Sequence, residues 1–202
     1  IEAIESAFCR FAKTIPADGH LLIAHGEERC GRVAKETPAT VWTFGLHAQA
    51  DIRATDVRVD SEGTHFTLHL PGAPPTSARL SIWGDHNLMN ALTASGLAYA
   101  AGAPVKGIVE ALPTFSLPKK RQELRGVVED IPVVDDFAHH PTAITETIRA
   151  TRERYPDRRV LALFEVESNT SRRRVFQEDF GAALGSADYV WFCQPHEKAD
   201  NL

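Results

Sequence analysis

The chain has 202 residues, a net charge of −5 and 43% hydrophobic residues, values that are ordinary for a soluble globular protein. It contains no apolar run near the length that spans a bilayer and no signal-peptide pattern over its first ten residues. A net negative charge argues against a nucleic-acid partner. Cys9, Cys30 and Cys193 are widely spaced, which fits free thiols in a reducing compartment. We therefore expect a cytoplasmic protein without a membrane span.

Both ends of the sequence indicate a piece of a longer protein. The only methionine is Met89, so the chain does not begin with an initiator residue. It opens within an amphipathic helical pattern, with Ile4, Phe8 and Phe11 at helical spacing. It stops at Leu202, shortly after an apolar strand-like run.

The first half of the chain predicts a mixed sheet with helices. Its periodicity predicts helices over 1–13, 27–36, 86–101 and 105–112, and strands over 21–24, 40–44, 51–59, 64–70 and 78–82. The first two strands are short and apolar, as in buried parallel pairs. The third and fourth alternate more strictly, and the turn residues at 60–63 between them predict a hairpin.

A domain boundary is predicted near Pro118, where prolines and the basic pair Lys119-Lys120 interrupt the pattern. We assign 1–117 to a first domain and 118–202 to a second. The second predicts strands over 123–129, 133–134, 160–164 and 189–192, and helices over 142–154 and 175–184. Helices that alternate with short strands indicate a mainly parallel sheet. The fold class is therefore α/β in both parts.

Residues 84–90, Gly-Asp-His-Asn-Leu-Met-Asn, form the first polar cluster. Asp85 or Asn87 can cap the following helix. Asn87 and Asn90 lie about one turn apart, so both amides project near the helix start. An amide offers a donor and an acceptor together and can read a base edge. A capped helix with one buried amide would explain the same residues.

Arg121 follows the predicted boundary directly. Its fixed fork of donors can clamp an anionic ligand. With Lys119 and Lys120 beside it, the run can equally be a solvated face.

Residues 133–142, Val-Val-Asp-Asp-Phe-Ala-His-His-Pro-Thr, end a predicted strand and open a helix at Pro141. Asp136 lies where an acidic residue accepts ribose hydroxyls in nucleotide-binding folds. His139 and His140 are candidates for metal ligation, acid–base chemistry or phosphate contact, and a structural role is open for each. Because adjacent histidines on a turn seldom point the same way, we predict no metal site here.

A fourth cluster, residues 165–174, follows another predicted strand. Ser168, Asn169 or Thr170 would cap the next helix. Three arginines from Arg172 onward would oppose that helix's dipole, a cost that a bound anion would offset; solvent-facing arginines are the alternative. The chain has no P-loop, no GxGxxG and no GxSxG sequence.

In this order and spacing, the four clusters resemble the Mur ligase family. Residues 84–90 match its Gly-x-His-Asn-x-x-Asn signature, residues 115–121 its Phe…Arg segment, and residues 134–142 its Asp-Asp-Tyr/Phe-Gly/Ala-His-His-Pro-Thr motif. The resemblance is strong over 84–177, whereas 1–83 fit by pattern only. The Phe-Ala version of the motif, followed by Ser-Asn-Thr, is closest to the branch that uses the tripeptide L-Ala-γ-D-Glu-meso-diaminopimelate.

The resemblance implies an ATP-dependent ligase that activates UDP-N-acetylmuramate as an acyl phosphate and joins it to the tripeptide. The cofactor-binding residues that it implies are His86, Asn87, Asn90, Arg121 and Asp136. The substrate-side residues that it implies are His139, His140, Ser168, Asn169, Thr170 and Arg172. The family's P-loop and Mg²⁺ ligands would precede residue 1. We therefore assign no catalytic residue within the chain, and we expect the chain alone to be inactive.

One departure from the branch leaves alternatives open. Val166 and Glu167 replace its usual Pro-Arg, and Glu167 reverses the charge at a position that could meet a substrate carboxylate. The alternatives are a ligase that adds L-alanine to the same sugar and a non-catalytic nucleotide-binding paralogue. A metal-dependent hydrolase is disfavoured, because no full ligand set occurs at metal spacing. The sequence indicates no oligomeric state.

Overall fold

The computed structural model describes residues 2–165 and 176–193. The chain divides into two compact units. The first comprises Ile1–Ile82 and His86–Phe115, and the second comprises Trp83–Asp85 and Ser116–Leu202. Every helix among the described residues is too short or too polar to span a lipid bilayer.

The first unit contains one five-stranded mixed sheet. Its strands, in spatial and chain order, are β1 (His20–Ala24), β2 (Thr40–Gly45), β3 (Ile52–Asp60), β4 (Gly63–His69) and β5 (Thr76–Leu80). The pairings β1–β2 and β2–β3 are parallel, and the pairings β3–β4 and β4–β5 are antiparallel. This agrees with the short apolar strands at the start of the chain and the alternating strands after them.

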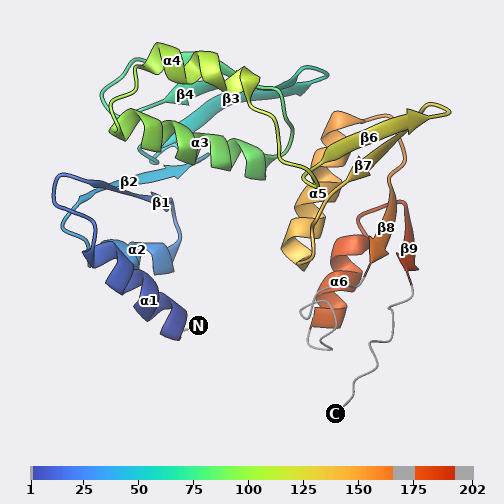
Figure 1. The fold of residues 1–202 in the computed structure, drawn as a ribbon, viewed down its shortest axis with the longest axis horizontal. Coiled ribbons are helices and arrows are strands. Elements are labelled where there is room, and N and C mark those ends of the chain that lie inside the picture. Colours follow the sequence, from blue (N-terminus) through green and yellow to red (C-terminus); the bar gives the residue numbers. More distant parts are fainter. Residues whose placement is uncertain (1, 166–175, 194–202) are drawn as a thin grey trace. The chain divides into compact units, whose positions relative to one another are not determined.

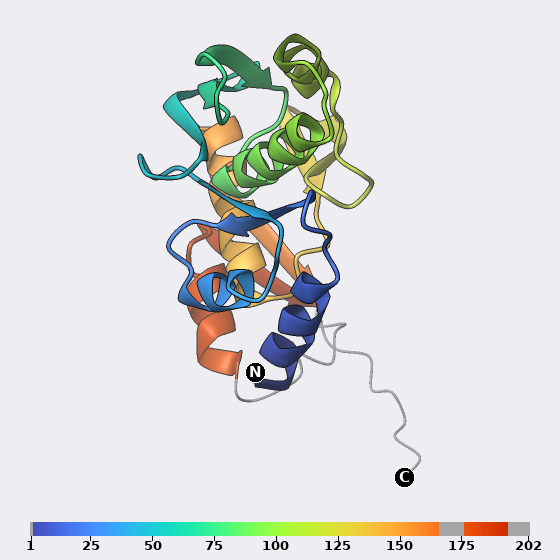
Figure 2. The same cartoon turned by 90° about the vertical axis from the view of Figure 1, so that its left-hand side faces the viewer.

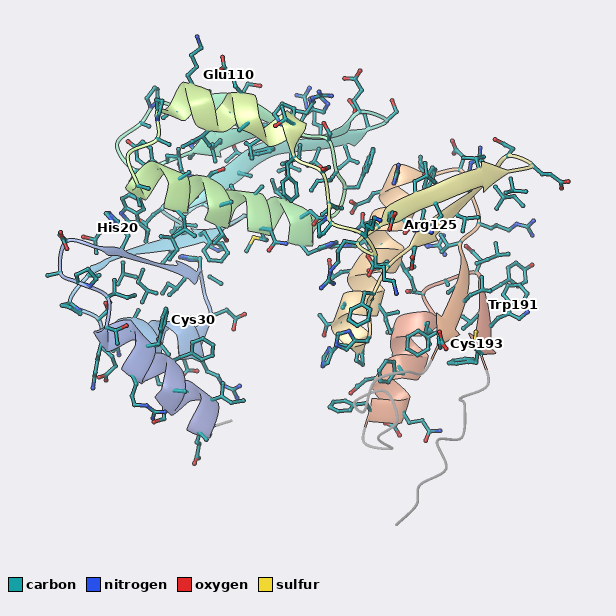
Figure 3. All side chains as sticks on the ribbon, viewed as in Figure 1. His20, Cys30, Glu110, Arg125, Trp191 and Cys193 are labelled. Carbon is teal, nitrogen blue, oxygen red and sulfur yellow. The ribbon has the colours of Figure 1, made fainter. Side chains whose placement is uncertain are left out.

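The helices of the first unit are α1 (Glu2–Lys13), α2 (Glu28–Ala34), α3 (Asp85–Ala100), α4 (Val105–Ala111) and the 3₁₀ turn η1 (Leu112–Thr114). The first residue of α3, Asp85, belongs to the second unit. Helices α1 and α2 lie side by side (Figure 1 and Figure 2). Arg32 on α2 reaches both carboxylate oxygens of Glu5 on α1, at 2.6 and 3.0 Å. On α4, Glu110 projects from the helix into solvent (Figure 3).

Helix α3 is held against the sheet by close packing. The largest fully buried side chains are Ile52, Leu68, Leu80, Leu88 and Leu92, of which the last two lie one turn apart on α3. One turn further on, a Cβ atom on Gly96 would lie 2.3 Å from the Cδ1 atom of Ile52. Glycine therefore permits the helix to approach the sheet this closely. The packing fixes which face of α3 is buried, and so fixes the direction of the amides near its start.

The second unit contains an antiparallel hairpin and a parallel pair of strands. The hairpin joins β6 (Glu123–Val128) to β7 (Ile131–Asp135), and the parallel pair is β8 (Leu161–Glu165) with β9 (Tyr189–Cys193). Two helices, α5 (Pro141–Arg154) and α6 (Gln177–Leu184), pack on each other and form a core with β8. That core comprises Ile144, Ile148, Phe164, Phe180, Ala183 and Leu184. Trp191 lies on the side of β9 away from α6 (Figure 3).

The sequence of the β6–β7 turn does not predict a hairpin. Its two residues, Glu129 and Asp130, both adopt the left-handed conformation, with φ of 49° and 65°. A two-residue hairpin turn of this kind normally carries Asn-Gly or Asp-Gly. Here the Arg158 guanidinium holds the Asp130 carboxylate at 3.0 and 3.1 Å. A contact distant in sequence thus stabilises a turn that lacks the usual local residues.

The predicted hairpin between β3 and β4 is confirmed, and Gly63 is its critical residue. Asp60 pairs with Gly63, whose φ is 128°. A Cβ atom at this position would lie 1.9 Å from the carbonyl oxygen of Leu80 on the neighbouring strand. Only glycine fits both the backbone conformation and the space.

We predict that Gly63→Ala destabilises the protein by more than about 3 kcal/mol, because it combines a forbidden φ with a backbone clash. Gly72→Ala is the matched control. Gly72 also has a positive φ, of 72°, but has no atom within 4 Å of an added Cβ. We expect its cost to be about 1 kcal/mol. Urea denaturation of both variants measures the difference, and equal costs would contradict the packing argument.

Candidate nucleotide site

Burial distinguishes the two amides at the start of α3. Asn87 is 5% exposed, whereas Asn90 is exposed. His86, between the helix start and Asn87, is half-buried. Gly84 before the helix has a φ of 93°, and Asp85 places a carboxylate in the first turn, where the helix dipole favours it. Of the two amides, that of Asn90 is therefore accessible from solvent and that of Asn87 is not.

In the second unit, the Asp136 carboxylate joins two loops. Its Oδ2 atom accepts a hydrogen bond from the backbone N–H of Gln122 at 2.9 Å, and its Oδ1 atom accepts one from Ala138 at 2.8 Å. A third bond runs from the N–H of Phe137 to the carbonyl oxygen of Lys120, at 2.8 Å. The loop after β7 is thus tied to the loop before β6.

Arg121 lies in the second of these loops, between two residues with left-handed backbones. Lys120 has a φ of 59° and Gln122 a φ of 47°. The Gln122 side chain is buried, and Arg121 is exposed. The structure therefore brings two residues that the sequence predicts as ligands, Arg121 and Asp136, into one pair of connected loops.

The two histidines of the same motif have different surroundings. His139 places its Nδ1 atom 3.0 Å from the carbonyl oxygen of Phe137, and its ring lies 4.9 Å from the Phe137 ring. His140 immediately precedes α5, and its ring lies edge-on to Phe176 at 6.0 Å. Both imidazoles are exposed, and Pro141 begins the helix as predicted. Within residues 2–165 and 176–193, no group of three or more His, Cys, Asp or Glu could hold a metal ion.

The substrate-side prediction at the fourth cluster lies outside the described residues. This applies to Ser168, Asn169, Thr170 and Arg172, and also to the departures at Val166 and Glu167.

Helix α5 makes contacts that its sequence does not predict. The Arg154 guanidinium lies 4.4 Å from the centroid of the Trp83 ring. Arg149 pairs with Asp85 at 3.0 Å and with Glu146 at 2.6 Å. The second unit includes Trp83–Asp85, and so the first two residues of the 84–90 cluster. The sequence of α5 gives no local signal of Trp83 and Asp85, because these two residues lie more than sixty residues earlier.

Both units are α/β, and each carries polar residues at a strand end or a helix start, the places where α/β folds commonly bind ligands. The Mur ligase middle domain profile matches residues 1–98, and the profile named Mur ligase, glutamate ligase domain matches residues 120–202. The chain belongs to the Mur ligase family.

Two kinds of ligase occur among its curated relatives. The UDP-N-acetylmuramate–L-alanyl-γ-D-glutamyl-meso-2,6-diaminoheptandioate ligase of Haemophilus influenzae is 35% identical over 199 residues, which are 98% of this chain and 43% of that protein. The UDP-N-acetylmuramate–L-alanine ligase of Clostridium novyi is 33% identical over 188 residues, 93% of this chain and 40% of that protein. The chain thus spans about two fifths of the length of these relatives.

Solved structures show the same fold. A murein peptide ligase from Psychrobacter arcticus matches with a TM-score of 0.67 and 32% identity, covering 97% of this chain and 41% of that one. MurF from Acinetobacter baumannii matches with a TM-score of 0.74 and 19% identity, covering 96% of this chain and 46% of that one. The second likeness concerns the fold alone.

Glu153 on α5 provides a pH-dependent test of the contacts around Trp83–Asp85. Burial raises the pKa of its carboxyl group above the ordinary value of 4.5, and the nearby Asp85 raises it further, against the opposing Arg149. Because the pKa of Glu153 is higher in the folded state than in the unfolded state, its ionised carboxylate destabilises the folded state at pH values above the folded-state pKa. This loss of stability disappears at pH values below the unfolded-state pKa.

We therefore predict that Glu153→Gln increases the free energy of unfolding at pH 7, and that the gain vanishes below about pH 4. Glu146→Gln is the control, because Glu146 lies in close contact with Arg149 and loses an ion pair. Urea denaturation at pH 7 and pH 4 gives the comparison. A gain of equal size at both pH values would show that charge is not its cause.

Proposed function

We propose that the complete protein is an ATP-dependent ligase that joins UDP-N-acetylmuramate to L-Ala-γ-D-Glu-meso-diaminopimelate in peptidoglycan recycling. Membership of the Mur ligase family supports a ligase of this general kind. The observation that carries the nucleotide assignment is the connected loop pair that presents Arg121 and Asp136 together. The Haemophilus influenzae relative, which is named for the same reaction, supports the choice of tripeptide.

Each nucleotide contact follows from the chemistry of a described side chain. Asn90 is exposed and supplies an amide donor and acceptor for the adenine edge, while His86 and the buried Asn87 support it. Arg121 binds the phosphates through its fork of donors. Asp136 accepts hydrogen bonds from ribose hydroxyls. A carboxylate has about four acceptor sites, and two backbone bonds leave room for these.

The reaction proceeds by two transfers. The carboxylate of UDP-N-acetylmuramate attacks the γ-phosphorus of ATP, and ADP leaves. The amino group of the peptide then attacks the acyl carbon, phosphate leaves, and the amide nitrogen loses a proton. Holding the nucleotide in place is the contribution that this chain's residues make to the first transfer.

Magnesium completes the proposed cofactor set, since it neutralises the phosphates in reactions of this class. The described residues do not form a site for it, and the sequence contains no P-loop. No step of the mechanism is therefore assigned to a metal-binding residue of this chain.

Near the incoming peptide we propose His139 and His140, with Ser168, Asn169, Thr170 and Arg172. A cytoplasmic location accords with its three free thiols.

We predict that Asn90→Ala and Arg121→Ala weaken ATP binding by the complete protein. Arg121→Ala loses a hydrogen bond to a charged phosphate, which should lower the affinity for ATP about tenfold or more. Asn90→Ala loses a neutral hydrogen bond, which should lower that affinity several-fold. Calorimetric titration with ATP measures both. Arg159→Ala is the control, since Arg159 is also an exposed arginine of the second unit but lies against Tyr189. Unchanged affinity in both test variants would refute their assignment.

A second candidate function is the ligation of L-alanine to the same sugar nucleotide, which the Clostridium novyi relative supports. We predict a higher kcat/KM for the tripeptide than for L-alanine when the complete protein is assayed with ATP and UDP-N-acetylmuramate. Phosphate release measures both rates. A preference for L-alanine would favour the second function, and absence of turnover with either amine would favour a non-catalytic paralogue.

A further inference from the structure

The loop that carries Arg121 adopts a backbone that its own residues disfavour. Lys120 and Gln122, on either side of Arg121, have φ of 59° and 47°. In the left-handed region the Cβ atom of an L-residue approaches the following carbonyl oxygen, which glycine avoids. Two such residues in a three-residue segment persist only where surrounding contacts hold them.

The bonds that hold this loop come from outside it and lie on both sides of Arg121. After Arg121, the N–H of Gln122 donates to the Asp136 carboxylate at 2.9 Å. Before it, the carbonyl oxygen of Lys120 accepts from Phe137 at 2.8 Å, and its N–H donates to the Glu123 Oε2 atom at 2.9 Å. The last bond is the largest cause of the lowered pKa of Glu123.

The Asp136 carboxylate also fixes its own loop. While Oδ2 holds Gln122, Oδ1 accepts the N–H of Ala138 at 2.8 Å. Both oxygens therefore act as acceptors for backbone donors. Asparagine at this position has one acceptor oxygen, and its NH₂ group would face the other N–H. Asp136→Asn keeps the size of the side chain and removes one of the two bonds.

We infer that Asp136 is a positioning residue for Arg121: by holding the left-handed loop, its carboxylate fixes where the guanidinium meets the phosphates of the nucleotide. This inference rests on the proposed nucleotide-binding function and deepens it. The role is additional to any contact with ribose, because such a contact leaves the two backbone bonds in place. Through this role, the affinity of the protein for the nucleotide phosphates depends on the Asp136 carboxylate, although its charge alone would repel them.

The two roles of Asp136 are separable by the ligand used. A ribose contact contributes equally to the binding of adenosine and of ATP. Positioning of Arg121 contributes to ATP alone, because adenosine has no phosphate. The quantity to measure is the dissociation constant of adenosine divided by that of ATP, in the complete protein. A general loss of folded protein does not change this ratio.

We expect Asp136→Asn to lower the ratio about tenfold, the loss expected for a charge-assisted bond, and Arg121→Ala to lower it by a similar factor. Because both act on one contact, the double variant should lower it no further. Lys120→Gly should restore most of the ratio in the Asp136→Asn background. Glycine adopts the left-handed conformation without the Cβ penalty, and the bonds of Lys120 in this loop use its backbone.

Glu123→Ala provides an independent test if Asp136→Asn fails to fold. Glu123 holds the opposite side of the loop, so its removal should also lower the ratio. Arg125→Ala is the matched control. It removes the ion pair of Glu123 at 3.1 Å and leaves the bond from Lys120 intact. The control should bind with an unchanged ratio.

The outcomes separate the two proposals. If Arg121→Ala lowers the ratio but folded Asp136→Asn leaves it unchanged, the positioning role is wrong and the nucleotide assignment stands. If Asp136→Asn cannot be folded, an unchanged ratio in Glu123→Ala overturns the positioning role. If Arg121→Ala leaves the ratio unchanged, Arg121 does not meet the phosphates, and both proposals fall.

Discussion

The hydrogen bonds that the Asp136 carboxylate accepts from two loops are the interaction on which the arrangement of the candidate site in the second unit depends. Strand β7 ends at Asp135, and a chain that leaves a strand has backbone N–H groups without ladder partners. Asp136 accepts a hydrogen bond from one of them, that of Ala138, and a second from Gln122, which lies fourteen residues earlier and just before β6. The same side chain therefore ends the strand, shapes the turn into α5 and connects that turn to the segment carrying Arg121.

In the first unit, the corresponding constraint is the packing of α3. Leu88 and Leu92 are fully buried, and Gly96 permits contact with Ile52 on the sheet. With these positions facing inward, the helical period leaves Asn87 buried and Asn90 exposed. The different exposure of the two amides thus follows from the apolar residues that fix the rotation of the helix. Core packing and the exposure of Asn90 are thus specified by one set of side chains.

Much of this arrangement is predictable from local sequence. Alternation identified β3 and β4, the turn residues at 60–63 identified their hairpin, and Pro141 identified the start of α5. Their signals are local because period, turn chemistry and capping involve neighbouring residues. The resemblance identified Arg121 and Asp136 as ligand candidates, and the structure places them in connected loops.

What escaped prediction depends on contacts distant in sequence. The turn at Glu129 and Asp130 lacks glycine and is held by Arg158. The left-handed residues beside Arg121 are held by Asp136 and Phe137. Asp85 and Trp83, which contact Arg149 and Arg154, lie more than sixty residues before them. No pattern within a window of a few residues carries this information. The left-handed backbone conformations are disfavoured locally and are stabilised by groups elsewhere in the chain, and the arginine contacts join residues far apart in sequence.

The assignment of Trp83–Asp85 to the second unit has a consequence for dissecting the protein. The chain passes from one unit to the other at residues 82–83, 85–86 and 115–116, so no single cut separates them. A recombinant second unit that begins at Ser116 would lack the indole under Arg154 and the carboxylate beside Arg149. Helix α5 would then expose the surface that Trp83 covers. The compact second unit is discontinuous in sequence, although the family profiles that match the chain are continuous segments.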